Sequence, residues 1–552
     1  MKLQIRKKHI DLLIAKKHDI YLSYWQKNEL GEKLFEMDVA KWDKKALADL
    51  KIIVWKYAEE DSACKNLVKQ LTTYEQLRAN PEGTKLKKVK DADTPIKDYI
   101  YASAHHWLFR EHDDKNLYPY FVSDVRYVSP SRYNRAHVRI DCHYIHGNKK
   151  EGVCISLYVE HVRGRTVKEM LEGQKWYVEN DSIFKIYEKE LDTYRKYSAM
   201  IGEQFVGKNI GFLKSDGYYR WKRDIFLSKE GINARLVVDT DFSKEVKDYT
   251  DLCYSAHEED EDEEGGKKKS KKDEEPEVPF EPMLPIHLFV DCFYLQEHTD
   301  IYVHVNNITP YVYDDKVGDK LVLPTDTKDL IDIMMTGTKD LLEDIVVGKK
   351  GGIIILATGH AGTGKTLTAE VYSEIMKRPL YVVPSHQLGI GVDELEKNLR
   401  TILGRASRWR AILLIDEADV YIHERGDDIE QNAIVGIFLR ILEYYNGILF
   451  MTSNRATIID DAILSRATAH IRYEKPEGEE LKRIWKVLST QFQVKMDDAL
   501  IEKSAKELTG MSGRDIKNLL KLTRLLSIRR EKPVDMEMLK FASKFQDFQT
   551  KK

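Results

Sequence analysis

Cysteine is scarce in this sequence, and its pattern argues against a disulfide-stabilised protein. The 552 residues contain five cysteines, an odd number without C-x-x-C spacing. Disulfide frameworks use paired cysteines at higher density, so the pattern indicates a reducing compartment, and we expect a soluble, cytoplasmic protein. Cys142, His143 and His146 lie close together, but without a second ligand pair they favour a half-buried strand over a metal site.

Long hydrophobic runs are also absent. The longest apolar stretches, 353–357 and 411–415, are far shorter than the ~20 residues that span a membrane. Residues 1–20 are interrupted by charged side chains, which disfavours a secretory leader. We therefore expect neither secretion nor a membrane partner.

Neither sign of charge dominates the composition. Lys and Arg number 88 against 91 Asp and Glu, for a formal net charge of -3, so nucleic-acid binding would need a local basic patch. Arg126, Arg132, Arg135 and Arg139 offer a candidate patch, but a solvated strand face is the favoured interpretation. Nucleic acid is therefore possible as a partner but not favoured.

The pattern of apolar residues divides the chain into four regions. Helical spacing predicts a mostly helical region over residues 1–110, and alternating apolar residues predict a β-rich α+β domain over residues 111–320, with a helix near 183–201. In residues 321–476, strand and helix patterns alternate, which predicts an α/β domain. Residues 477–552, after Pro476, keep only helical periodicity and predict a small helical appendage.

A charged insertion interrupts the second region. Residues 258–264 are all acidic and a lysine-rich block follows, so residues 257–278 lack the apolar side chains that would offset the entropy of ordering. We expect a disordered linker or hairpin loop, with an interaction tail as the alternative. Residues 287–290 and 300–305 are expected to add strands to the same sheet as the strands before the insertion.

Short apolar strands alternate with amphipathic helices in the third region. The expected strands are 353–357, 380–384, 411–415, 448–452 and 470–473. This alternation predicts a parallel sheet that helices cover on both faces.

A glycine-rich segment follows the first of these strands. It runs Gly359-His360-Ala361-Gly362-Thr363-Gly364-Lys365-Thr366 and matches the P-loop pattern G-x-x-x-x-G-K-[ST], with a helix expected from Leu367. Between a strand and a helix, such a loop turns its backbone N–H groups toward nucleotide phosphates. We expect Lys365 to contact the β- and γ-phosphates and Thr366 to ligate Mg²⁺, with an ordinary glycine-rich turn as the alternative.

A pair of carboxylates ends the third expected strand. Asp416 and Glu417 follow the apolar residues 412–415, and the carboxyl end of a parallel strand lies beside the P-loop. There Asp416 can hold the Mg²⁺ shell and Glu417 can polarise an attacking water. A helix cap is the alternative for acidic residues at this position, but together with the P-loop the pair favours nucleotide hydrolysis.

Together these motifs resemble the AAA+ ATPase family over residues 321 to about 530. Within this span residues 416–420 and 438–447 resemble a subgroup with large N-terminal regions. The resemblance implies an α/β fold, a P-loop AAA+ parallel sheet with a helical lid, here preceded by an α+β N-terminal region. It also implies ATP and Mg²⁺ as cofactors.

The resemblance further implies roles for residues outside the two motifs. Asn454 would orient the water, Arg466 would reach the γ-phosphate of a neighbouring subunit, and Arg514 would contact the nucleotide from the lid. A strand-end turn for Asn454 and a surface position for Arg466 are the alternatives. Asp344 and Ile345 would form part of the adenine pocket. The expected nucleotide-binding residues are Gly359, His360, Ala361, Gly362, Thr363, Gly364, Lys365, Thr366, Leu367, Asp344 and Ile345; the expected metal ligands are Thr366 and Asp416.

The leading functional hypothesis is an ATP-hydrolysing ring, expected to be a hexamer, that remodels a macromolecular partner bound by the N-terminal region. The expected pore segment, 387–392, lacks the aromatic residue that many chain-threading relatives use to grip a polypeptide. This departure favours the alternative hypothesis, a nucleotide-gated oligomeric switch or scaffold with slow ATP turnover.

Overall fold

The structure is a computed structural model. It describes residues 2–16, 29–30, 34–38, 44–58, 61–79, 85–103, 105–132, 134–146, 149–213, 224–229, 232–239, 284–336, 352–389, 391–425, 429–454 and 459–546. The charged insertion expected at 257–278, and Asp344 and Ile345, lie outside these residues. Within them, no helix combines the length and the apolar character needed to cross a membrane.

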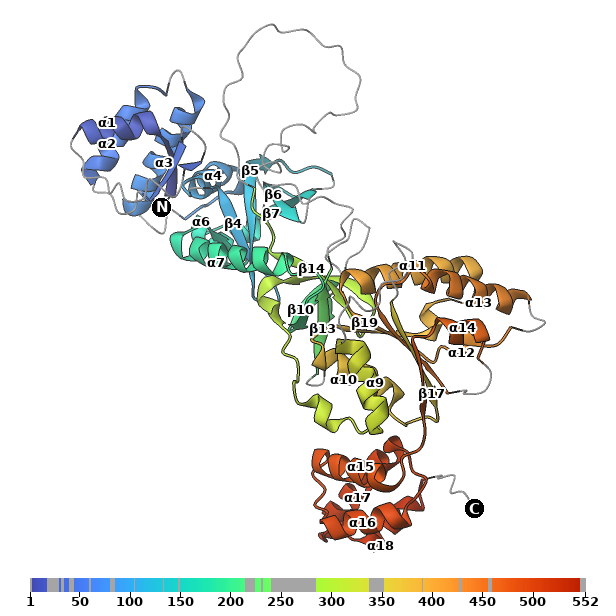
Figure 1. Cartoon of the computed structure of the whole chain (residues 1–552). Coiled ribbons are helices and arrows are strands. Elements are labelled where there is room, and N and C mark those ends of the chain that lie inside the picture. Colours follow the sequence, from blue (N-terminus) through green and yellow to red (C-terminus); the bar gives the residue numbers. More distant parts are fainter. Residues whose placement is uncertain are drawn as a thin grey trace.

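A small helical module forms the N-terminal end of the described chain, at the upper left of Figure 1. Its elements are β1 (Lys2–Arg6), α1 (Lys7–Ala15), β2 (Glu29–Leu30), β3 (Leu34–Asp38), α2 (Lys44–Trp55) and α3 (Ser62–Ala79). The strands pair in the antiparallel order β1-β3-β2. The helices bury a core of their own around Leu50, Val54 and Leu67.

A five-stranded antiparallel sheet follows, in the order β7-β6-β5-β4-β8. Its elements are α4 (Asp93–Tyr101), β4 (Trp107–Glu111), β5 (Leu117–Val128), β6 (His137–His146), β7 (Lys149–Tyr158), α5 (Val159–Val162), α6 (Val167–Glu172) and β8 (Trp176–Val178). Cys142 is buried on β6, and no metal-ligand cluster of three or more His, Cys, Asp or Glu occurs in the described part of the chain. Asp141 pairs with both Arg126 and Arg139, so acidic side chains offset part of the candidate basic patch.

A second antiparallel sheet lies between the first sheet and the parallel sheet. It comprises β9 (Gln204–Gly207), β10 (Ile210–Leu213), β11 (Asp224–Phe226), β12 (Ser228–Lys229), β13 (Ile232–Val238), β14 (Phe289–Tyr294), β15 (Thr299–His304) and β16 (Ile308–Pro310), and α7 (Asp181–Ser198) precedes it. The order is β11-β10-β15-β14-β13-β9-β16, with β12 paired to β13. After the insertion, β14 pairs with β13 and β15 pairs with β10, so both join a sheet of strands that precede the insertion. What the sequence did not indicate is that the strands before the insertion divide into two sheets.

A parallel five-stranded sheet forms the third region, in the order β18-β19-β20-β17-β21. Its strands are β17 (Ile353–Gly359), β18 (Leu380–Pro384), β19 (Ile412–Asp416), β20 (Ile448–Ser453) and β21 (Ala469–Tyr473). Its helices are α9 (Thr325–Thr336), α10 (Lys365–Ile375), α11 (Val392–Arg408), α12 (Asp419–Ile422), α13 (Ile429–Leu442) and α14 (Asp461–Arg466). This sheet with its helices, preceded by antiparallel sheets, confirms the expected fold class.

Helices cover both faces of this sheet, with α9 and α10 on one side and α11 and α13 on the other (Figure 1). Alternate residues of one strand enter different cores: Ile412 and Leu414 pack with α9 and α10, whereas Leu413 and Ile415 pack with α11 and α13. Burial of both strand faces explains why the strand residues are almost continuously apolar.

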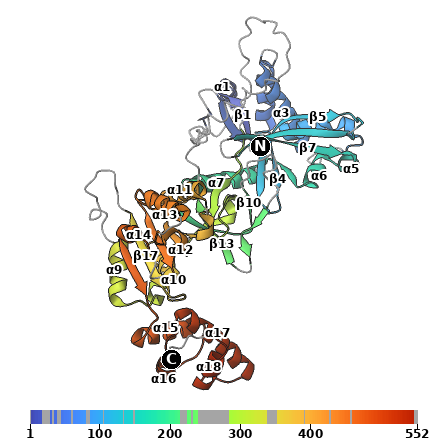
Figure 2. The ribbon, with the colours of Figure 1, turned by 90° about the vertical axis from the view of Figure 1, so that its right-hand side faces the viewer.

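Four helices form the C-terminal unit, which Figures 1 and 2 show as a separate group beyond the end of β21. They are α15 (Gly478–Gln491), α16 (Asp498–Glu507), α17 (Gly513–Arg530) and α18 (Met536–Ser543). They share a buried core around Trp485, Leu519 and Leu539. The short segment between Tyr473 and Gly478 joins this unit, hereafter the lid, to the parallel sheet.

The second antiparallel sheet packs on the ends of two helices of the α/β domain. The Asp239 carboxylate, only 5% exposed, lies 3.0 Å from Arg408 Nη2 and 3.6 Å from Arg405 Nε near the end of α11. Near the end of α10, Glu374 accepts hydrogen bonds from the Tyr311 hydroxyl (2.7 Å) and the Asp314 N–H (3.0 Å). Phe293 packs against Arg405 and Trp409 at the end of α11. The two parts thus share a continuous core, and partly buried ion pairs link them.

Candidate active site

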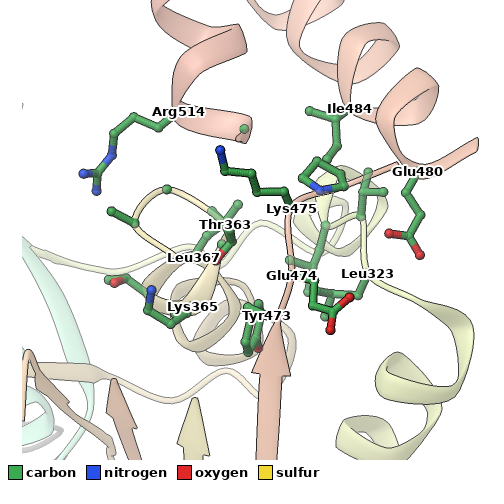
Figure 3. A pocket seen from close by; sticks show the side chains of 18 of the residues that line it. Leu323, Thr363, Lys365, Leu367, Tyr473, Glu474, Lys475, Glu480, Ile484 and Arg514 are labelled. Carbon is green, nitrogen blue, oxygen red and sulfur yellow. The ribbon is translucent and has the colours of Figure 1, made fainter. Parts of the chain in front are cut away.

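A cavity of about 870 Å³ lies between the carboxyl ends of the parallel strands and the lid (Figure 3). The P-loop residues 361–366 form one wall together with Leu367 at the start of α10. Asp416, Glu417 and Asn454, from the ends of β19 and β20, line the same space. The cavity therefore brings together both motifs that the sequence predicted.

Glycine is required at two points of the P-loop. A Cβ added to Gly359, which has φ of +140°, would lie 2.0 Å from the Tyr473 carbonyl oxygen on the neighbouring strand β21. A Cβ on Gly362, with φ of +79°, would lie 2.6 Å from Arg514 Cβ in the lid. Both glycines thus permit close backbone approach in conformations that other residues adopt only with strain.

The Lys365 ammonium occupies the centre of the loop. It donates hydrogen bonds to the carbonyl oxygens of Gly359 and His360 at 2.8 Å, and to Asn454 Oδ1 at 3.0 Å. Burial lowers the pKa of Lys365, and the nearby Asp416 carboxylate opposes this shift. The cation is therefore held at the cavity wall by neutral oxygens and an adjacent negative charge.

Two side-chain oxygens that could ligate a metal ion lie where the metal was expected. The Thr366 hydroxyl donates to Asp416 Oδ1 at 3.2 Å, so both side chains reach the same small volume beside the P-loop. A hydroxyl and a carboxylate are hard ligands that suit Mg²⁺, which keeps several waters and needs few protein ligands. The residues present therefore fit a Mg²⁺ ion bound together with nucleotide phosphates.

The strand order explains how the acidic pair and Asn454 meet the P-loop. β20 lies between β19, which ends in Asp416, and β17, which leads into the loop. Asn454 follows β20 and consequently sits between the loop and the acidic pair. Glu417 has a positive φ of 55°, an uncommon backbone conformation for a residue other than glycine.

The two arginines predicted for the site occupy different places. Arg514, in the first turn of α17, lines the cavity, and its N–H lies 3.3 Å from the Gly362 carbonyl oxygen. Arg466 ends α14 outside the residues that line this cavity; it donates to the Ala462 carbonyl oxygen at 3.3 Å and lies 4.0 Å from Glu443. Only Arg514 is therefore placed to meet a nucleotide in the same subunit.

Part of the cavity wall was not predicted from the sequence. Residues 321–324 and the lid residues Ile484, Leu488 and Phe492 give it an apolar side. Lys475 and Lys517 add two cations, and Figure 3 shows the Lys475 side chain pointing into the space below the lid. None of these positions carries a short motif. Their proximity arises from the tertiary packing of the lid and of residues 321–324 around the sheet.

Comparison with known proteins agrees with this geometry. Residues 355–475 match the family model described as "ATPase family associated with various cellular activities (AAA)". The match runs from the P-loop strand to the start of the lid. It therefore covers the P-loop, the acidic pair, Asn454 and Arg466.

Individual relatives show the same restricted likeness. The chain is 29% identical over 205 residues to the ATP-dependent zinc metalloprotease FtsH of Nitrosococcus oceani, covering 34% of this chain and 32% of that protein. It is also 29% identical over 180 residues to a protein of Methanothermobacter thermautotrophicus named as a homolog of a 26S proteasome regulatory subunit, covering 31% and 48%. The chain thus spans less than half the length of either relative. Residues 355–475 of this chain thus form a domain that matches the model of the AAA ATPase family.

Proposed function

We propose that this chain hydrolyses ATP at the cavity between the parallel sheet and the lid. The observation that supports this most is the convergence of Lys365, Asp416, Glu417 and Asn454 on one space from three adjacent strand ends. Phosphoryl transfer depends mainly on positioning and electrostatic stabilisation, which such a constellation supplies.

Each residue has a distinct proposed role. Lys365 contacts the β- and γ-phosphates, Glu417 polarises the attacking water, and Asn454 orients that water. Thr366 and Asp416 hold Mg²⁺, which neutralises phosphate charge when bound. Arg514 contacts the same nucleotide from the lid. The apolar wall at residues 321–324 accommodates the base.

We further propose a ring, expected to be a hexamer, in which Arg466 reaches the nucleotide of the neighbouring subunit. Its position outside its own subunit's cavity supports this role, because a residue acting in trans must be displayed on the surface. Its side chain is 36% exposed. The N-terminal region would bind the macromolecular partner that the ring remodels.

The pore segment favours a second candidate, a nucleotide-gated switch or scaffold with slow turnover. Residues 387–392 contain no aromatic side chain. The Tyr421 hydroxyl lies within hydrogen-bond distance of the Ser385 and Gly389 carbonyl oxygens, at 2.9 and 2.8 Å, and so anchors the described part of this segment to α12. An anchored segment without an aromatic grip suits partner binding better than threading.

Two substitutions test hydrolysis at this cavity. We expect Lys365→Ala to abolish ATP binding and Glu417→Gln to keep ATP bound while lowering turnover by about two or more orders of magnitude, because phosphate binding and water activation reside on different residues. Calorimetry measures the affinity and phosphate release measures turnover. The exposed Lys397→Ala on α11 is the control and should match the wild type. Equal ATP affinity in Lys365→Ala and the wild type would refute the site.

A further inference from the structure

One threonine bonds to both residues of the acidic pair. Thr452, the penultimate residue of β20, is 2% exposed, and its hydroxyl donates a hydrogen bond to Asp416 Oδ1. The Thr452 hydroxyl oxygen in turn accepts a hydrogen bond from the Glu417 N–H at 3.0 Å. A hydroxyl has one proton to donate and lone pairs to accept, so a single side chain satisfies both contacts without competition.

The neighbouring atoms extend this contact into a clamp on the turn after β19. The Thr452 carbonyl oxygen accepts the Ala418 N–H at 2.9 Å. The Ser453 hydroxyl donates to Asp419 Oδ1. Four consecutive residues, from Asp416 to Asp419, are thus tied to the end of β20 by hydrogen bonds to two residues.

The clamp explains the backbone of Glu417. Its φ of 55° is unfavourable for a residue with a Cβ, and such a conformation persists only where its surroundings over-determine it. The hydrogen bonds from the Glu417 and Ala418 N–H groups to Thr452 are local contacts that fix this turn. The direction of the Glu417 side chain therefore depends on Thr452.

The contact with Asp416 affects the proposed metal site. Asp416 Oδ1 accepts from both the Thr366 and the Thr452 hydroxyls. If Thr366 held a metal, it would release its bond to Asp416, whereas Thr452 is not among the expected ligands and would keep the carboxylate oriented. An oriented carboxylate binds its target with less loss of side-chain entropy.

We propose that Thr452 is a positioning residue that fixes both carboxylates of the active site, orienting Asp416 through its hydroxyl proton and the Glu417 backbone through its hydroxyl oxygen. This inference rests on the proposed function. Valine has nearly the same shape but can make neither contact, whereas serine can make both. The hydroxyl, rather than the volume of the side chain, should therefore decide activity.

Turnover and binding are compared in three proteins. We expect Thr452→Val to lower kcat by about 10- to 100-fold with an ATP affinity in EDTA within about twofold of the wild type, because misplaced catalytic groups affect the chemical step more than phosphate binding. Thr452→Ser should restore most of kcat. Thr358→Val, which removes another buried strand hydroxyl bonded to His470 at 2.9 Å, controls for lost stability and should keep kcat.

A second measurement does not require turnover. Mg²⁺ should tighten the binding of a fluorescent ATP analogue in the wild type and in Thr452→Ser, but much less in Thr452→Val. If the Thr452→Val protein is insoluble, Thr452→Ala replaces it in this comparison. A wild type without turnover would refute the proposed hydrolysis and leave this measurement valid. The positioning role is overturned if Thr452→Val keeps wild-type kcat and its full Mg²⁺ response, or if Thr452→Ser is as defective as Thr452→Val.

Discussion

At the scale of single residues, Lys365 shows how burial prepares a cation for phosphate. Burial partly disfavours the charged form by lowering the pKa of Lys365, and the described oxygens that accept its protons are neutral. Phosphate oxygens would reverse this preference, because a nearby negative charge favours the protonated amine. Nucleotide binding should therefore raise the pKa of Lys365.

A pH dependence of ATP affinity follows from this shift. Because the protein with bound nucleotide should hold the proton more tightly than the nucleotide-free protein, ATP affinity should be constant near neutral pH. It should fall by up to about tenfold per pH unit once the pH exceeds the lowered pKa of Lys365 in the nucleotide-free protein. Calorimetry across the alkaline range measures this, together with proton uptake on binding.

The matched variant is Lys365→Arg, whose guanidinium stays charged throughout. Whatever its value at neutral pH, the ATP affinity of Lys365→Arg should not fall as the pH rises through the alkaline range. A wild-type affinity that is independent of pH up to the ordinary lysine pKa would contradict the linkage.

Motif residues of the site could be predicted from the sequence, and the rest of the site could not. The residues from Gly359 to Thr366 determine a loop through local geometry, so this short motif is enough to predict the role of Lys365. Phe492 reaches the cavity only because the lid folds over the sheet, and residues 321–324 reach it through their packing beside α9 and α10. Thr452 was also missed, since its contacts depend on the pairing of β20 with β19.

At the scale of elements, the end of α11 is built to receive the second antiparallel sheet. Gly202, just before β9, has φ of +82°, and a Cβ there would lie 2.8 Å from Trp409 Cα and 3.2 Å from the Arg408 carbonyl oxygen. Both obstacles are backbone atoms, which cannot move aside as a side-chain tip can. Gly202 therefore allows the second antiparallel sheet to approach the α/β domain this closely.

Two glycine-to-alanine substitutions near this junction should have opposite effects. Gly202→Ala should destabilise the protein by at least about 1–2 kcal/mol because of its left-handed backbone, with the clash adding to this. Gly404→Ala, in the middle of α11 with no atom within 4 Å of the new Cβ, should stabilise it by up to about 1 kcal/mol. Calorimetric unfolding of the full chain measures both. Equal midpoints for the two variants would show that the junction is not as tightly packed as described.

The elements of the α/β domain were predictable because each strand is a short apolar run bounded by polar or glycine residues. The pairing of the antiparallel strands was not. Alternating apolar residues identify β14 and β15 as strands, yet which strand lies beside which depends on contacts across long loops. The sequence therefore predicted the presence of these strands but not the division of the antiparallel strands into two sheets.

At the scale of the whole molecule, the proposed role of Arg466 requires assembly. An arginine supplied in trans is worth roughly 10³ to 10⁵ in rate in phosphoryl-transfer systems. Specific ATPase activity should thus rise with protein concentration, and Arg466→Ala should bind ATP but be nearly inactive. Turnover measured over a dilution series, alongside light scattering, checks both statements.

Mixing two inactive variants tests the same role without relying on concentration. A ring of Arg466→Ala and Lys365→Ala subunits contains sites where an intact P-loop meets an intact Arg466 from its neighbour, so some activity should return. Neither variant alone can form such a site. If the subunits demonstrably mix and the mixture stays inactive, or if dilute monomer hydrolyses ATP at the full rate, Arg466 does not act in trans.

The two helices that meet the second antiparallel sheet also begin at functional loops. Helix α10 starts at Lys365 of the P-loop, and α11 starts at Val392, the last residue of the pore segment. Their far ends are tied to the sheet through Glu374 and through Arg405 and Arg408. In the proposed ring, the second antiparallel sheets of all subunits would form a second tier. The distance between neighbouring sheets would then change whenever the ATPase domains rotate. Fluorophore pairs on that tier would report such rotations directly, whereas motion of the lid would leave their distance unchanged.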